Sequence, residues 1–129
     1  MVKSIMEMFD VGKLLTRIGI LFIFIAGIVQ AAEWGYYNVS DIIQYGQLYP
    51  YPIMVLAAGI VAIILAILIF FVFLPMADKN RMNAGIFIII FSIVAAVFAF
   101  EWAIIGAPGA VLCLVGAILF MVETESGGA

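Results

Sequence analysis

The chain has 129 residues and a mass of 14.0 kDa, with 68% apolar residues, 10% charged residues and a mean hydropathy of +1.35. Soluble domains are roughly 45 to 50% apolar, and disordered chains combine low hydropathy with high net charge, so both classes are excluded. The length suits one domain. We therefore expect residues 1–129 to form a single transmembrane domain.

The possible chemistry is limited by the side chains that the sequence lacks. It contains no histidine and a single cysteine, Cys113. Zinc and haem sites draw on several His or Cys ligands, and a cysteine nucleophile needs a histidine-like base. We therefore expect no metal, no cofactor and no enzymatic activity. The formal net charge of -3, without any basic run, argues against a nucleic-acid partner.

Four apolar runs have the character of membrane spans, at residues 14–32, 53–74, 84–105 and 107–122. A hydrocarbon core of about 30 Å needs about 20 helical residues, within a range of about 17 to 25. The third run has a shorter alternative that ends at Phe100, and the fourth, with 16 residues, is marginal. Because backbone in lipid must satisfy its own hydrogen bonds, these runs are expected to be helical. The predicted fold is an all-α bundle of four helices, with a turn near Gly106 between the last two.

The basic residues indicate the orientation of this bundle. All of them precede span one, lie in its first turn or separate spans two and three: Lys3, Lys13, Arg17, Lys79 and Arg81. The positive-inside rule then places both termini and the loop 75–83 in the cytoplasm, and the loop 33–52 outside the cell membrane. The start of the chain also resembles a cleavable signal peptide ending near Ala31, an alternative that the length of the apolar run disfavours.

The predicted outer loop, residues 33–52, contains all 5 tyrosines of the chain. Ser40 and Asp41 form a candidate N-cap, after which Ile42, Tyr45 and Tyr49 recur on one helical face. This pattern predicts a short interfacial helix on the outer leaflet, followed by an extended Tyr-Pro-Tyr-Pro segment that leads into span two. The loop serves either membrane anchoring or partner docking, because Tyr and Trp are frequent in binding hot spots.

Two single residues carry weaker signals. Asn38-Val39-Ser40 is an N-glycosylation sequon on the predicted outer side. Arg17 is in the first turn of span one, where its guanidinium can extend to the headgroups. The alternative for Arg17 is a partner within the membrane, such as a lipid phosphate or another subunit.

The two halves of the chain resemble each other. When span one is aligned with span three, the dipeptide Glu33-Trp34 falls on Glu101-Trp102. Spans two and four align so that Gly59 falls on Gly109. This pattern predicts two tandem transmembrane hairpins, related as a parallel repeat about an axis along the membrane normal.

Each span also carries a face of small residues, which let helix backbones approach closely in lipid. The candidate packing residues are Gly19 and Gly27 in span one, Ala58, Ala62 and Ala66 in span two, Ser92, Ala96 and Ala99 in span three, and Gly109, Cys113 and Ala117 in span four. All four faces pack against one another within one bundle or, alternatively, part of their surface packs against a partner subunit.

Residues near the predicted outer ends form a second set of candidates. As one interpretation, Glu33 and Glu101 attract a cation or relay protons at an outer mouth. As the other, they are interfacial acids beside the anchoring side chains of Trp34 and Trp102. Gln30 is deeper and suits an interhelical hydrogen bond. The candidate outer-mouth or interface residues are Gln30, Glu33, Trp34, Tyr45, Tyr49, Glu101 and Trp102.

These features favour a non-enzymatic membrane protein that is an accessory or structural subunit of a larger membrane assembly, or a self-assembling membrane component. Its expected partners are the lipid bilayer and either other membrane subunits or copies of itself. The alternative is a small homo-oligomeric transporter or channel for a cation or proton-coupled solute, with glutamates at its outer mouth. In size and span count the chain resembles the small multidrug resistance transporters. That family uses a glutamate in the middle of its first helix, where this chain has Ile23 to Val29, so no family is assigned.

Overall fold

A computed structural model of the chain describes residues 8–127, which are almost entirely helical. Its first element, α1, runs without interruption from Met8 to Tyr45 and contains 38 residues. At 1.5 Å per residue this helix is about 57 Å long, nearly twice the roughly 30 Å hydrocarbon core of a bilayer. The residue that follows its last turn, Gly46, has a φ of 73°, the left-handed conformation that favours glycine at a helix C-terminus. The Gly46 N–H donates to the Ile42 carbonyl at 2.9 Å.

The next helical stretch consists of three elements, α2 (Pro50–Leu68), the π-helix η2 (Ile69–Phe73) and α3 (Leu74–Met76). Pro50 is suited to the first helical position, because the N–H that proline lacks would have no partner inside the helix there. At the end of η2 the N–H of Leu74, the next residue, donates to the Ile69 carbonyl. This wider turn interrupts the α-helical spacing, and the sequence analysis did not anticipate it.

The second half of the structure contains α4 (Arg81–Phe98), the 3-10 helix η3 (Phe100–Trp102) and α5 (Ala103–Gly127). Asn80 begins α4 as an N-cap, with its side-chain oxygen accepting from the Asn83 N–H at 3.1 Å. The predicted turn near Gly106 is wrong, because α4 ends at Phe98 and α5 already begins at Ala103. Gly106 and Pro108 both lie inside α5.

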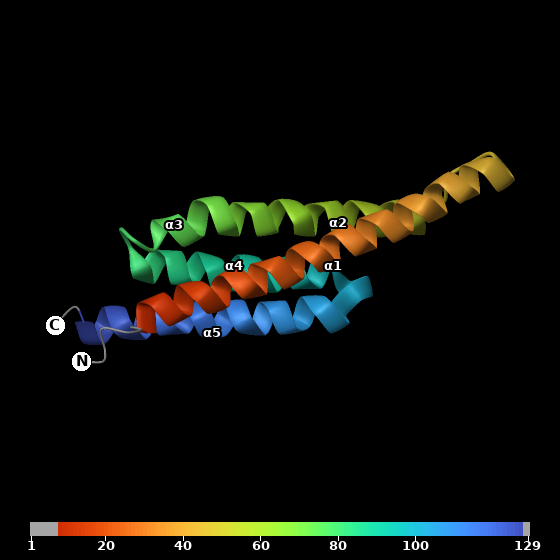
Figure 1. The fold of residues 1–129 in the computed structure, drawn as a ribbon. Coiled ribbons are helices and arrows are strands. Elements are labelled where there is room, and N and C mark those ends of the chain that lie inside the picture. The colour runs from red at the N-terminus through yellow and green to blue at the C-terminus, as the bar shows by residue number, and fades with distance from the viewer. Residues whose placement is uncertain (1–7, 128–129) are drawn as a thin grey trace.

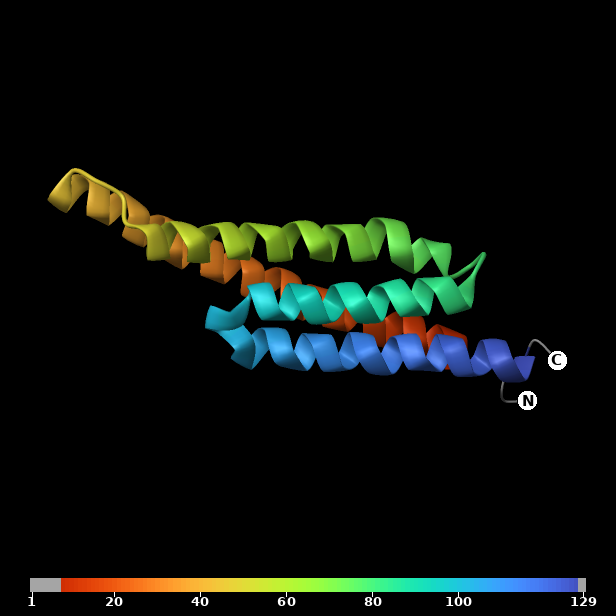
Figure 2. The ribbon, with the colours of Figure 1, turned by 180° about the vertical axis from the view of Figure 1, so that it is seen from behind.

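The arrangement of these helices confirms an all-helical bundle with four helices long and apolar enough to cross a membrane: Asp10–Tyr45, Pro50–Met76, Arg81–Phe98 and Phe100–Leu119. Helix α1 packs against α2 and α5, and α4 packs against the same two helices (Figures 1 and 2). The core between them includes the fully buried side chains of Ile23, Ile69 and Ile88. The chain therefore fits a multi-pass membrane protein.

The structure differs from the prediction of a separate interfacial helix. Ser40 and Asp41 lie inside α1 and cap nothing, because the helix continues through them to Tyr45. Tyr49 lies outside the helix, in extended backbone with φ -107° and ψ 147°. Tyr51 and Pro52 already belong to α2, so the extended Tyr-Pro-Tyr-Pro segment is also wrong. The outer end of α1 projects beyond the rest of the bundle (Figure 1).

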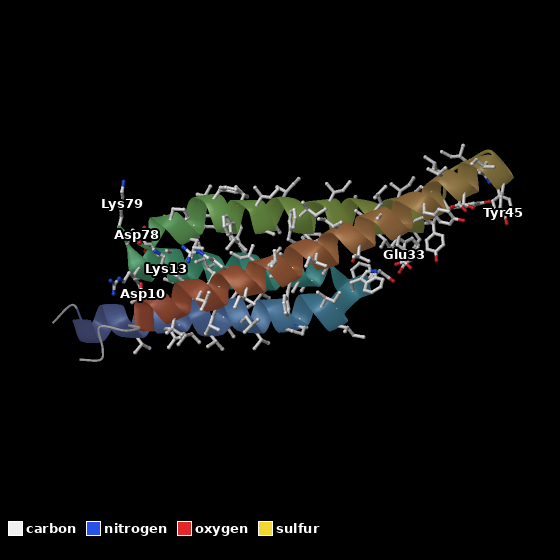
Figure 3. All side chains as sticks on the ribbon, in the orientation of Figure 1. Asp10, Lys13, Glu33, Tyr45, Asp78 and Lys79 are labelled. Atoms are coloured by element: carbon white, nitrogen blue, oxygen red, sulfur yellow. The ribbon has the colours of Figure 1, made fainter. Side chains whose placement is uncertain are left out.

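The two ends of the bundle carry different charges. One end holds Asp10, Lys13, Asp78 and Lys79 (Figure 3), with Arg17 beside Asp78 and Arg81 in the first turn of α4. It is named here the cationic end because all lysines and arginines of the described residues lie there; Glu123 and Glu125, in the last turns of α5, belong to the same end (Figure 1). Lys13 Nζ lies 3.1 Å from Asp78 Oδ1, which ties α1 to the connection between α3 and α4. The opposite end, named the glutamate end, holds Glu33 and Glu101. Lys3 lies outside the described residues.

Candidate functional site

The glutamate end brings together residues that lie far apart in the chain. Gln30, Glu33 and Trp34 come from α1, whereas Glu101 and Trp102 form the 3-10 turn between α4 and α5. Of the predicted outer-mouth residues, Gln30, Glu33, Glu101 and Trp102 are joined by hydrogen bonds. The tyrosines at positions 45 and 49 lie elsewhere, and Tyr45 is far along the projecting end of α1 (Figure 3).

Gln30 is the centre of this cluster and is fully buried, with 0% of its surface exposed. Its Nε2 donates to the Val55 carbonyl of α2 and to the Phe98 carbonyl at the end of α4, both at 2.9 Å. Its Oε1 accepts from the Glu101 N–H at 3.1 Å. The last carbonyls of a helix have no partner within it, so Gln30 caps α4 from a neighbouring helix. This side chain therefore fixes the position of the turn.

The Glu33 carboxylate accepts a hydrogen bond from the indole of Trp102, in the second glutamate-tryptophan dipeptide. Trp102 Nε1 donates to Glu33 Oε1 at 3.0 Å, and both side chains are half-buried. Trp102 also packs on a small core formed by Ala26, Ala62 and Ala99. The Glu33 carboxylate thus links α1 to η3, which gives it a structural partner.

Glu101 has a different partner, which the sequence analysis missed. The Tyr51 hydroxyl donates to Glu101 Oε2 at 3.1 Å, and both residues are exposed. Tyr51 comes from the first turn of α2, where the sequence predicted extended chain. The signal that was missed is Pro50, because proline is common at the first helical position. A helix that begins there puts Tyr51 in its first turn.

Trp34 and Asn38 lie one turn apart on α1 and face the start of α2. The Trp34 ring packs edge-on against Tyr37 and Tyr51, with ring centroids 5.0 and 5.4 Å apart. Asn38 Nδ2 donates to the Trp34 carbonyl at 2.7 Å and to the Pro52 carbonyl at 3.1 Å. Two buried atoms here, Trp34 Nε1 and Asn38 Oδ1, have no hydrogen-bond partner.

The environment of Asn38 also bears on the predicted sequon. The residue lies inside a helix and is only 7% exposed. Its amide nitrogen, the atom that would carry a glycan, already donates to two carbonyls. Glycosylation at this position would therefore require the outer part of α1 to unfold locally.

The predicted packing residues of α1 and α5 meet at one seam. A Cβ at Gly109 would lie 2.7 Å from the Gly19 carbonyl oxygen, and a Cβ at Gly19 would lie 2.8 Å from Cys113 Sγ. Further along, a Cβ at Gly116 would lie 2.5 Å from the Gly12 carbonyl oxygen and would clash with Thr16. The contacts of Gly12 and Gly116 were missed, although both continue the same helical spacing.

The other small residues fill further helix contacts. A Cβ at Gly27 would lie 3.1 Å from the Gly59 carbonyl oxygen, which marks the close approach of α1 and α2. Of the remaining candidates, six are buried, namely Ala62, Ala66, Ser92, Ala99, Cys113 and Ala117. Ala58 and Ala96 are half-buried at the edges of their faces. Most of the small-residue surface is thus used inside the chain.

The projecting segment, named here the arm, comprises residues 36–49. Many of its large apolar side chains are exposed, with Ile43 at 77%, Tyr36 at 69% and Tyr45 at 62%. Tyr45 and Tyr49 contact each other edge-on, with ring centroids 6.0 Å apart. Asp41 is the only charged residue of the arm. The arm therefore presents an exposed apolar surface, while Tyr37 and Asn38 at its base contact Trp34 and the Pro52 carbonyl.

The chemistry that this geometry permits at the glutamate end is hydrogen bonding between helices. Each glutamate accepts from a neighbouring side chain, and within residues 8–127 no three acidic or cysteine side chains are grouped as metal ligands would be. The cavities beside Arg17 and beside Met82 are lined by none of the residues of the cluster. Comparison with known protein families, with curated proteins and with solved structures finds no match to this chain.

Proposed function

We propose that the protein is a non-enzymatic membrane component that works by assembly, as an accessory or structural subunit or through copies of itself. The observation that carries this proposal is the arm, an exposed apolar helix end at one end of the bundle. Residues 33–45 of α1 add about 20 Å of helix beyond the predicted span, more than the headgroup layer of a bilayer accommodates upright. Exposed apolar surface of this kind marks protein or membrane contact sites.

The cluster at the glutamate end supports the same proposal. Gln30 makes its hydrogen bonds to three backbone groups of the same chain. Glu33 and Glu101 are each held by an aromatic donor rather than pointing into a common opening. These contacts favour a role in holding the helices together over a role in moving ions.

The proposal also includes the membrane orientation, the location of the arm and the tandem hairpins that the sequence predicts. We place the protein in the cell membrane with its cationic end in the cytoplasm, because Lys and Arg are retained on that side. We assign the arm to the outer surface, where it lies along the leaflet or against a partner. We also retain the tandem-hairpin interpretation, which is supported by the packing of α1 on α2 and of α4 on α5.

The experiment that tests assembly is native mass spectrometry of the protein extracted from its own membrane in mild detergent. We expect a complex with stoichiometric partner chains or further copies. Ile43→Lys should abolish the complex because it places a charge in the apolar surface, whereas the matched variant Gln44→Lys on the same arm should retain it. A wild-type monomer, or a complex that survives Ile43→Lys, would contradict the proposal.

The transport alternative has its own test in proteoliposomes. Glu33→Gln and Glu101→Gln each remove a negative charge and keep an oxygen acceptor for the aromatic donor. Under the assembly proposal neither variant changes ion flux. Loss of a wild-type cation or proton flux in both variants, with the helices still folded, would replace the assembly proposal with the transport one.

Orientation is tested by labelling with a membrane-impermeant maleimide in intact cells. Cysteines introduced at Gln47 and at Lys79, in a Cys113→Ala background, report on the arm and on the cationic end. We expect labelling at position 47 only. Labelling at position 79 only would reverse the proposed orientation.

A further inference from the structure

A groove between α1 and α2 at the cationic end is the strongest unassigned feature of the surface. It consists of two adjoining cavities that share three lining residues, Arg17, Phe70 and Phe71. The cavity nearer the cationic end has a volume of about 220 Å³ and is also lined by Lys13, Leu74, Pro75 and Asp78. The deeper cavity has a volume of about 180 Å³ and is otherwise lined by apolar residues, Ile20, Leu21, Phe24, Ala66 and Ile67.

The groove changes along its length from charged to apolar. From Lys13 to Phe24 it follows about 16 Å of α1, at 1.5 Å per residue. Its first part lies at the level where Lys and Arg meet the headgroups, and its second part lies at the level of the hydrocarbon chains. A phospholipid has the same sequence of charged and apolar parts along the same direction.

The π-helix η2 forms one wall of the groove. Phe70 and Phe71 both belong to it, their rings contact each other edge-on at 5.0 Å, and they are 38% and 68% exposed. The packing against α1 leaves these rings facing the groove, so no other helix of the bundle covers them. π-helical turns occur frequently at functional sites, which agrees with a built site at this position.

The charges lining the groove determine which headgroup fits. Lys13 pairs with Asp78 at 3.1 Å, so these two charges offset each other. Arg17 is exposed, and no described residue accepts a hydrogen bond from its guanidinium or pairs with it. The lining therefore carries one excess positive charge at Arg17, whose planar fork suits bidentate binding of a phosphate.

We propose that this groove binds one anionic phospholipid, with its phosphate at Arg17 and one acyl chain in the apolar cavity between α1 and α2. A headgroup with a single net negative charge, such as phosphatidylglycerol, neutralises the excess charge of the lining. Basic pockets between transmembrane helices bind anionic headgroups in the same way. This site rests on the membrane placement proposed above but not on the arm or on assembly, so the two proposals can fail separately.

The test is lipid titration of the delipidated full-length protein, followed by native mass spectrometry. We expect one tightly bound phosphatidylglycerol and at least about tenfold weaker binding of phosphatidylcholine, because the choline cation adds a positive charge where the lining already has one in excess. Arg17→Gln should weaken phosphatidylglycerol binding by about tenfold or more and remove the preference over phosphatidylcholine. Lys79→Gln also removes one positive charge at the cationic end, but outside the groove. It should leave the affinity for phosphatidylglycerol and the preference over phosphatidylcholine unchanged.

A second variant tests the acyl-chain part of the site without changing charge. Leu21 is 55% exposed and lines the apolar cavity, so Leu21→Trp should fill it and reduce the bound lipid. Ile60→Trp, at a 45% exposed position of α2 outside the groove, is its control. Inorganic phosphate should not compete with the lipid at equal concentration, because it cannot fill the apolar cavity. Equal lipid binding by wild type, Arg17→Gln and Leu21→Trp, or displacement by inorganic phosphate, would overturn the proposal.

Discussion

The two glutamate-tryptophan dipeptides have the same sequence and different structural roles. Glu33-Trp34 lies inside the continuous helix α1, whereas Glu101-Trp102 forms the 3-10 turn between α4 and α5. Trp102 donates to Glu33 at 3.0 Å, but Trp34 Nε1 has no hydrogen-bond partner. A matching pair of residues in two spans thus does not imply matching contacts, because the local backbone and its neighbours decide which atoms meet.

Gln30 bonds to the backbone at the turn that contains the second dipeptide, so its replacement should have the largest effect on stability. Gln30→Leu keeps the side-chain size but leaves the Phe98 carbonyl and the Glu101 N–H without their partner. We expect a loss of about 2 to 4 kcal/mol in the free energy of unfolding, because unsatisfied buried groups cost about 1 to 3 kcal/mol each. Denaturation in mixed detergent micelles measures this loss.

The control for Gln30→Leu is Gln47→Leu. Gln47 is exposed in the arm, where its Nε2 lies 3.3 Å from the Tyr49 hydroxyl. Surface substitutions of this kind change stability by less than about 0.5 kcal/mol. If both leucine variants lost the same stability, the capping role assigned to Gln30 would be wrong.

Two glycines that follow Trp102 in α5, Gly106 and Gly109, differ in how much space a side chain would have. A Cβ at Gly109 would lie 2.7 Å from the Gly19 carbonyl oxygen, whereas the nearest atom to a Cβ at Gly106 is 3.7 Å away. Gly109→Ala should therefore destabilise the protein by about 1 to 3 kcal/mol through overpacking. Gly106→Ala should be neutral or stabilise it by up to about 1 kcal/mol, because alanine favours helix. Equal effects in the same unfolding assay would argue against a tight α1–α5 seam.

The indole N–H groups allow a direct test of the difference between the dipeptides. Trp102→Phe removes a donor that is bonded to Glu33, and Trp34→Phe removes a donor that has no partner. Both variants lose similar ring volume, so the difference between them isolates the hydrogen bond. We expect Trp102→Phe to be less stable than Trp34→Phe by about 1 to 2 kcal/mol. The reverse order would show that the Trp102–Glu33 bond does not stabilise the fold.

The smallest effect is expected where the contact is exposed. Tyr51→Phe removes the 3.1 Å hydrogen bond to Glu101 but keeps the ring against Trp34. Because water can replace this bond, the expected loss is about 0.5 kcal/mol or less. A double-mutant cycle with Glu101→Ala, which removes the acceptor, measures the coupling between Tyr51 and Glu101. A coupling energy above about 1 kcal/mol would show that this exposed bond stabilises the cluster as much as a buried one.

The sequence indicated much of the candidate site but not its internal contacts. Gln30, Glu33, Glu101 and Trp102 stand out because polar or aromatic residues are conspicuous at the ends of apolar spans. Tyr51 did not stand out, because its place depends on α2 beginning at Pro50. The hydrogen-bond partner of each glutamate comes from another helix. The sequence pattern within one helix gives no information about distances to its neighbours.

What the sequence by itself determined is the class of the molecule: an all-helical chain with four apolar helices and its basic residues at one end. These follow from the cost of exposing charge and unpaired backbone to lipid, which each segment carries on its own. The tertiary structure decided where α4 ends, because Gln30 supplies the missing backbone partners there instead of a local signal at Gly106. It also decided that α1 continues through Ser40 to Tyr45, because Asn38 holds this part of the helix against the start of α2 through the Pro52 carbonyl.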